Sequence, residues 1–248
     1  MTTPDVRWPR ASGPLELRPA TAADLDAVLV WRNRPEVTRW FINTVVDPDA
    51  FRARWLTAVD DPKDHSAIAV AGGDVVGFGT LELDDGLGQT HGDPANTRLV
   101  EAQLGYMIDP AHAGRGYATA LARGLLEVAF EEVGVRRVTA GCFAENTASW
   151  HVMERVGMRR EQHGVRDSWH AELGWIDGYT YALLADEWMP GAAADRCSAS
   201  AGDERIRDGT SPVRDDEEPD RGADPGDHDD PEGRDRKHRG GALFTSRT

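Results

Sequence analysis

The segment Asp109-Pro110-Ala111-His112-Ala113-Gly114-Arg115-Gly116 combines residue types that could hold an anion. Gly114 and Gly116 have no Cβ, so the backbone there can approach a ligand closely. The helical pattern that begins at Tyr117 adds unpaired N–H groups and the positive end of a helix dipole. These features predict a site for phosphate or pyrophosphate, and a plain tight loop is the alternative.

Two common phosphate motifs are absent from this segment. No Gly-Lys-Ser/Thr is present, which excludes a P-loop. The third glycine of a dinucleotide fingerprint is missing, and no acidic residue closes a second strand, which excludes the Rossmann pattern.

The composition of the chain changes near residue 190. All eight tryptophans lie before that point, and Phe244 is the only aromatic residue after it. Acidic runs such as 215–218 cannot bury enough apolar surface to offset the entropy of the chain. We therefore expect an N-terminal extension over 1–14, one folded domain over 15–190 and a disordered, acidic low-complexity tail over 191–248.

The charge and the cysteines limit the partners and the compartment. A formal net charge of −15 argues against general binding to nucleic acid or to an anionic membrane. Cys142 lies in an apolar run and Cys197 in the tail, so a structural disulfide is not expected. Because there is no apolar leader and no membrane-length segment, we expect a cytoplasmic protein. We expect it to be a monomer or a homodimer.

The spacing of apolar residues predicts an alternation of strands and helices in the order β-α-α-β-β-β-α-β-α-β-β. Gly72-Gly73-Asp74 is typical of a hairpin turn, and Thr21 with Asp24 of a capped helix start. The predicted strands cover 15–18, 66–71, 75–83, 99–108, 135–142, 158–166 and 179–184. The predicted helices cover 21–31, 47–59, the stretch from 117 to the cap at Gly134, and 146–156.

Four pieces of this pattern, in this order, resemble the GCN5-related N-acetyltransferase (GNAT) superfamily, and within it the RimJ/RimL-like group. The first is Trp31-Arg32-Asn33-Arg34-Pro35-Glu36-Val37, and the second is the strand end Gly105-Tyr106-Met107-Ile108. The third is Ala113-Gly114-Arg115-Gly116-Tyr117-Ala118, similar to the acetyl-CoA loop, with Ala113 where the family has Gln or Arg. The fourth is the Asn-x-x-Ser helix, Asn146 to Ser149, followed by Glu154-Arg155-Val156-Gly157-Met158. The resemblance covers roughly residues 15–188.

The resemblance implies an α/β fold with a mostly antiparallel, twisted sheet of about seven strands and about four helices. Two strands would splay apart at the acetyl-CoA site. The implied reaction is acetyl transfer from acetyl-CoA to a primary amine by direct attack. The acceptor implied is a protein N-terminal α-amine. A small amine, such as an aminoglycoside or a polyamine, and a non-catalytic CoA-binding sensor are the alternatives.

The same resemblance assigns the site residues. Glu101, on the strand leading to the site, is the expected general base, with Glu172 second, and Ser149 would protonate the departing thiolate. An ordinary surface glutamate and a helix cap are the alternatives for Glu101 and Ser149. The expected acetyl-CoA contacts are Met107, Ile108, Gly114, Arg115, Gly116, Tyr117, Ala118, Thr119 and Asn146.

Other conspicuous side chains have less specific roles. Tyr106 is expected to pack at the rim of the site rather than to act as an acid. At most two of Trp31, Trp40, Phe41, Trp169 and Trp175 should line an acceptor cleft. Four histidines, at positions 112, 151, 163 and 170, lack metal-ligand spacing, so we predict no metal.

Overall fold

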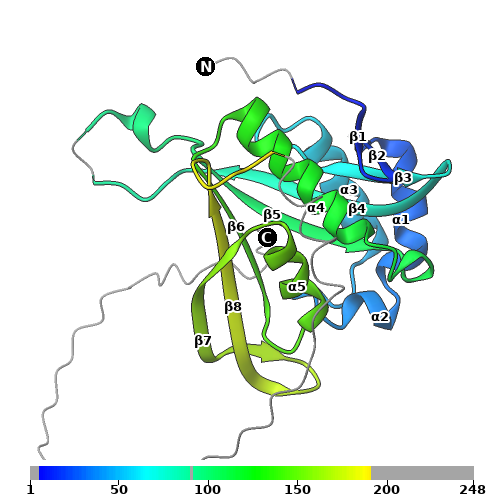
Figure 1. Cartoon of the computed structure of the whole chain (residues 1–248). Coiled ribbons are helices and arrows are strands. Elements are labelled where there is room, and N and C mark those ends of the chain that lie inside the picture. The colour runs from blue at the N-terminus through cyan, green and yellow to red at the C-terminus, as the bar shows by residue number, and fades with distance from the viewer. Residues whose placement is uncertain (1–5, 90–91, 191–248) are drawn as a thin grey trace, which may run out of the picture. The chain divides into compact units, whose positions relative to one another are not determined.

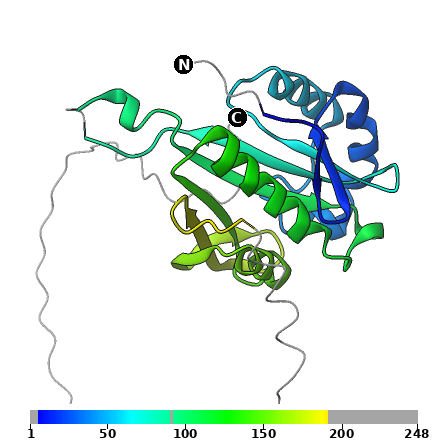
Figure 2. The ribbon, with the colours of Figure 1, turned by 45° about the horizontal axis from the view of Figure 1, so that its top comes forward.

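A computed structural model describes residues 6–89 and 92–190, which form one sheet of eight strands with helices on both faces (Figures 1 and 2). The predicted tail, 191–248, lies outside the described residues, as do the first five residues of the predicted extension. None of the helices seen in this part of the chain is long and apolar enough to cross a membrane.

The strands follow the order β1-β2-β3-β4-β5-β6-β8-β7 across the sheet. They are β1 (Arg10–Ser12), β2 (Leu15–Pro19), β3 (Ala67–Ala71), β4 (Asp74–Asp84), β5 (Glu101–Ile108), β6 (Arg137–Phe143), β7 (Arg159–His170) and β8 (Gly174–Leu184). All neighbouring strands are antiparallel except β5 and β6, which are parallel. The result is the mostly antiparallel sheet expected from the resemblance.

Five α-helices connect these strands. They are α1 (Leu25–Arg32), α2 (Pro35–Thr38), α3 (Pro48–Val59), α4 (Tyr117–Glu127) and α5 (Thr147–Arg155). A π-helical stretch, Val128–Val133, continues α4 up to Gly134, whose positive φ ends it. The Asp47 side chain accepts a hydrogen bond from the Ala50 amide and so caps α3, as its Asp-Pro-Asp sequence predicts.

Two apolar cores hold the helices against opposite faces of the sheet. On one face, α4 packs so closely on β4 that a Cβ on Gly79 would lie 2.5 Å from Leu125 Cδ1. On the other face, α1 and α3 enclose a core that includes Trp31, Trp55 and Phe78. The sheet therefore lies between two helical layers, one on each face (Figure 2).

The structure differs from the predicted elements at three places. Strand β1 was not predicted because three residues are too short to show an alternation, and it extends the sheet into the expected 1–14 extension. Helix α2 follows the Arg-Pro break as a single short turn. Strand β7 continues to His170 and β8 begins at Gly174, where buried polar residues (Ser168 and His170) and exposed tryptophans (Trp169 and Trp175) reverse the usual alternation.

An ion pair fixes the entry of the chain into α1. Asp24 accepts hydrogen bonds from the Thr21 amide and hydroxyl and from both terminal nitrogens of Arg18, at 2.5–2.8 Å. Burial alone would raise the pKa of this carboxyl, but the bonds from Arg18 and Thr21 lower it to about 2. Since the pKa of an unfolded Asp is about 3.9, the charged carboxylate stabilises the folded state.

We expect Asp24→Asn to lower the free energy of unfolding at pH 7 by about 2 kcal/mol. In the wild-type protein this contribution is present above pH 4 and is lost as the pH falls toward 2, because the folded pKa lies below the unfolded one. Urea unfolding at several pH values measures it. Asp26→Asn is the control, since Asp26 is exposed and pairs only with Arg52 at the surface. Equal losses in the two variants would contradict this account.

Candidate active site

Strands β5 and β6 separate soon after they begin. Their parallel register covers only Glu101–Gln103 and Arg137–Thr139, although both strands continue for several residues. The Val100 carbonyl accepts a hydrogen bond from the Arg136 amide, so even-numbered residues present their backbone to the β6 side. Beyond Gln103, this alternation leaves the backbone groups of Leu104, Tyr106 and Ile108 facing a gap. Backbone groups in such a gap need a partner.

The glycine turn lies at the end of β5. Gly114 and Gly116 both have φ near +75°, and a Cβ built on either would meet nothing within 4 Å. Gly116 is also the N-cap of α4, so the first amides of that helix point out of the turn without helical partners. An open, Cβ-free backbone at a helix N-terminus fits the phosphate cradle that the sequence predicts.

Two hydroxyl groups meet near the gap. Tyr106 Oη donates to the Ser149 carbonyl at 2.8 Å and lies 3.1 Å from Ser149 Oγ. Because the single Tyr106 proton is used on the carbonyl, the Ser149 hydroxyl can donate its own. Burial raises the pKa of Tyr106, so its phenol stays neutral. The cap of α5 is made by Asn146 Oδ1, which accepts from the Ser149 amide at 3.3 Å and leaves the Ser149 hydroxyl unused for capping.

A cavity of about 380 Å³ joins these features, and we call it the donor cavity. Most of the residues predicted to contact acetyl-CoA line it, together with Ser149: Met107, Ile108, Gly114, Gly116, Tyr117, Ala118, Thr119 and Asn146. Arg115 is exposed and does not line it. His112, His151 and Arg155 also line it, although none of them was predicted to contact acetyl-CoA; His112 and Arg155 lie within the quoted motifs, whereas no motif includes His151.

A second pocket lies on the α1–α3 face of the sheet, and we call it the acceptor pocket. It is lined by Arg32, by residues 41–43 and Val46, by Phe51 and Arg54 of α3, by alternate residues of β4 (Phe78, Thr80 and Glu82) and by residues 103–107 of β5. It shares Phe41, Tyr106 and Met107 with the donor cavity. The two spaces therefore meet at β5, beside the gap.

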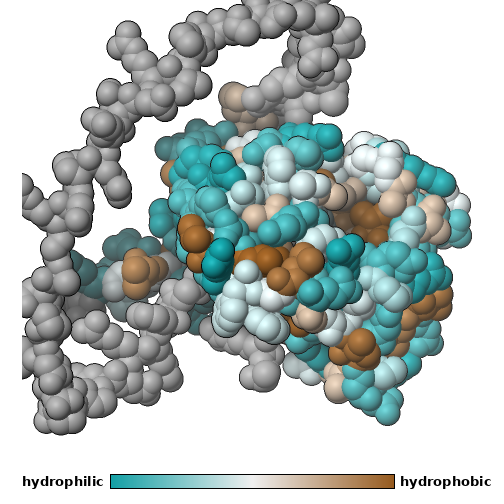
Figure 3. Space-filling view, turned by 90° about the horizontal axis from the view of Figure 1, so that it is seen from below, coloured by the Kyte–Doolittle hydropathy of each residue, from teal (hydrophilic) through white to brown (hydrophobic). Residues whose placement is uncertain are grey.

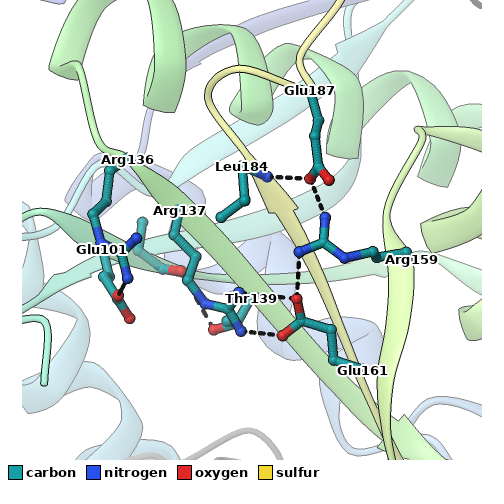
Figure 4. A network of polar contacts seen from close by, with 9 residues as sticks. Glu101, Arg136, Arg137, Thr139, Arg159, Glu161, Leu184 and Glu187 are labelled. Atoms are coloured by element: carbon teal, nitrogen blue, oxygen red, sulfur yellow. Dashed lines mark hydrogen bonds and ion pairs between the residues drawn. The ribbon is translucent and has the colours of Figure 1, made fainter.

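Glu101 does not lie at this meeting point. It begins β5, whereas the donor cavity is lined by residues from Tyr106 onward, about 17 Å further along a strand that rises roughly 3.4 Å per residue. Its carboxylate pairs with Arg136 at 2.6 Å, beside a network formed by Arg137, Arg159, Glu161 and Glu187 (Figure 4). The geometry does not support Glu101 as the base, because Glu101 lies at the start of β5, where β5 is still paired with β6 and is distant from the donor cavity.

The other predicted side chains divide between core and site. Trp31 is buried in the α1–α3 core, whereas Trp40 and Phe41 line the donor cavity. Trp169 and Trp175 are exposed on the β7–β8 hairpin and stack edge to face at 5.6 Å. Glu172 pairs with Arg39 at 3.5 Å, near the cavity mouth rather than inside it. Within 6–89 and 92–190, no cluster of His, Cys, Asp or Glu could hold a metal.

Comparison with known proteins agrees with this geometry. Residues 14–159 match the family described as "Acetyltransferase (GNAT) domain". The chain is 36% identical over 86 residues to "Uncharacterized N-acetyltransferase YnaD" of Bacillus subtilis, which covers 35% of this chain and 50% of that protein. It thus spans about half the length of the first curated relatives it matches.

Two further similarities extend over more of the fold. The "L-amino acid N-acetyltransferase AaaT" of Escherichia coli is 26% identical over 151 residues, or 60% of this chain and 86% of that protein. The structure titled "Mycobacterium smegmatis RimJ in complex with CoA-disulfide" has 26% identity and a TM-score of 0.60, and the match covers 78% of this chain and 95% of that one. The chain belongs to the GNAT acetyltransferase family.

Proposed function

We propose that this enzyme acetylates an α-amine, that of a protein N-terminus, by direct attack on acetyl-CoA. The observation that carries the proposal is the meeting of the donor cavity and the acceptor pocket at Tyr106 and Met107. A thioester on one face and an amine on the other can reach each other there without a covalent enzyme intermediate.

The donor would be held mainly by backbone. The amides from Gly114 to Thr119 would bind the pyrophosphate, with the exposed charge of Arg115 nearby. The free edge of β5 would pair with the amides of the pantetheine arm and polarise the acetyl carbonyl. Asn146 and Arg155, which also line the cavity, would contact the remainder of CoA.

The departing thiolate needs a proton, and Ser149 is the proposed donor. Its hydroxyl is buried, lies in the lining of the donor cavity and is 3.1 Å from Tyr106 Oη. Tyr106, which stays neutral, can orient the Ser149 hydroxyl through this contact. Tyr106 is therefore a positioning residue in this proposal.

The charges around the acceptor favour an α-amine over a polyamine. No carboxylate lines the donor cavity within the described chain, and Glu82 is the one carboxylate that lines the acceptor pocket. An α-amine, with a pKa of about 7.7–8.0, is partly neutral near pH 7, whereas a lysine or polyamine nitrogen near 10.4 is not. The acceptor pocket carries two arginines, Arg32 and Arg54, against one carboxylate, Glu82, which disfavours polycations. The name of AaaT, an L-amino acid N-acetyltransferase, agrees with an α-amine acceptor.

Exposed aromatic side chains support a protein as the acceptor. The β7–β8 hairpin exposes Trp169, Leu173 and Trp175, and its His170 packs on Trp40 of the donor cavity at 5.1 Å. Figure 3 views the molecule from below, where separate brown patches of high hydropathy lie among hydrophilic residues; tryptophan has a slightly hydrophilic value on this scale and is not drawn brown. A peptide that reaches the cavity would have aromatic surface to lie on.

A panel of acceptors tests this function. We expect acetyl-CoA to be consumed, with release of CoA thiol, in the presence of peptides that have a free N-terminus, and not with the same peptides blocked at that terminus. Spermidine and an aminoglycoside should give only the background rate. CoA release with polyamines alone would contradict the proposed acceptor, and acetyl-CoA binding without CoA release on any amine would favour a CoA-binding sensor.

Gly116→Val should weaken CoA binding by about tenfold or more, because a side chain there both strains a positive φ and fills the cradle. Titration calorimetry measures the Kd. Gly72→Val is the matched control, since Gly72 also has a positive φ and open space but lies in the β3–β4 hairpin turn. An unchanged Kd in Gly116→Val would remove the glycine turn from the site.

Ser149→Ala should lower kcat by about 10²-fold while the Kd of CoA changes little, since the hydroxyl acts on the thiolate rather than on the bound donor. Steady-state kinetics with a peptide acceptor provides the comparison. Ser12→Ala serves as the control, because it removes a buried hydroxyl that donates to the Ala120 carbonyl at 2.7 Å, outside the cavity. Equal kcat values in Ser149→Ala and the wild type would exclude Ser149 as the acid.

A further inference from the structure

We propose that Arg32 and Arg54 bind a carboxylate of the acceptor, so that the enzyme prefers amines that carry a carboxylate close to the reacting nitrogen. The proposal rests on the proposed α-amine function and adds the substrate class to it. The observation behind the proposal is the set of charged residues that line the acceptor pocket. This pocket lies on the opposite face of the sheet from α4.

Arg32 is a buried cation with an unused donor. It ends α1 and is only 4% exposed. Its Nη2 donates to the Asn43 carbonyl at 2.8 Å, and its guanidinium lies 4.7 Å from the centroid of the Phe41 ring. Its Nη1 has no hydrogen-bond partner in the part of the chain that the structure describes. Leaving a buried charged donor unpaired is costly, and a carboxylate in the pocket would satisfy it.

Arg54 brings a second positive charge to the same pocket. It lies on α3, is exposed, and forms no ion pair with any described residue. Both arginines line this one pocket, and burial together with the nearby charge of Arg54 lowers the pKa of Arg32. Two like charges that repel across a pocket are stabilised by an anion placed between them.

The opposite wall of the pocket carries a negative charge. Glu82 on β4 pairs in register with Gln103 on β5, on the sheet side, and both residues have interactions of their own. The helix side carries the two arginines and the sheet side the carboxylate. This distribution suits an acceptor whose ammonium lies toward β5 and whose carboxylate lies toward α1 and α3.

Two sources can supply such a carboxylate. One is the α-carboxylate of a free amino acid, and the other is an acidic side chain in the first residues of a peptide. Both present two oxygens to the guanidinium groups, for which arginine geometry is well matched. A neutral amine lacks this contact in either case.

The test compares acceptors that differ only in the carboxylate. One pair is L-leucine and L-leucinamide, with kcat/KM expressed per unprotonated amine because the carboxylate changes the pKa of the amine. The other pair is Glu-Ala-Ala-amide and Gln-Ala-Ala-amide. We expect the wild type to favour the carboxylate member of at least one pair by about 10- to 100-fold, and the pair that shows this identifies the source.

Arg54→Gln should reduce that preference to about threefold or less. Arg52→Gln, two residues away on α3 and paired with Asp26 at the surface, should keep the wild-type preference. Arg32→Gln should also lose it, and the Kd of CoA and the Tm show whether this buried variant has folded. If it has not folded, the Arg54→Gln result alone decides the proposal.

The outcomes separate this proposal from the proposed function. Equal use of both members in both pairs, or the same preference in Arg54→Gln and Arg52→Gln, would overturn the carboxylate site and leave the α-amine function intact. If none of the four α-amines releases CoA above background, the proposed function fails and the carboxylate site fails with it.

Discussion

The short parallel register between β5 and β6 is the constraint on which the site depends. Three paired residues hold the two strands together, and beyond Gln103 the β5 backbone has no strand partner on that side. Unpaired backbone groups inside a fold are costly unless a ligand or water satisfies them. The helices do not fill the gap. Helix α4 begins only after the glycine turn that follows β5, and α5 is held beside the gap by the hydrogen bond from Tyr106 to the Ser149 carbonyl. The gap is thus a built-in place for an extended ligand with amide groups.

The gap also explains why the two ligands come from opposite faces. The sheet separates the α4–α5 core from the α1–α3 core. A ligand on one face can reach the other face only where β5 and β6 separate. The donor cavity and the acceptor pocket share Tyr106 and Met107 at that point. Charges are arranged accordingly: open amides of the glycine turn on the donor side, and Arg32 and Arg54 opposite Glu82 on the acceptor side.

The sequence predicts the donor side better than the acceptor side, for a physical reason. Gly114, Gly116 and Asn146 act through local backbone geometry, so their spacing along the chain reveals them. Glu101 was misplaced because the point at which β5 leaves β6 is a tertiary property that no alternation records. Arg32 and Arg54 belong to different helices and become neighbours only when both pack on β4. The β7–β8 hairpin is longer than predicted because its tip buries Ser168 and His170 and exposes Trp169 and Trp175, the reverse of the usual pattern.

Amide hydrogen exchange with and without CoA tests the central claim most directly, that the donor occupies the free edge of β5 and the glycine turn. Binding should slow exchange in segments 104–108 and 114–119, because their amides gain partners. The β3–β4 hairpin segment 67–75 contributes no residue to the donor cavity and should exchange at the same rate in both states. Slowed exchange confined to other segments, with 104–108 and 114–119 unchanged at saturating CoA, would contradict the account.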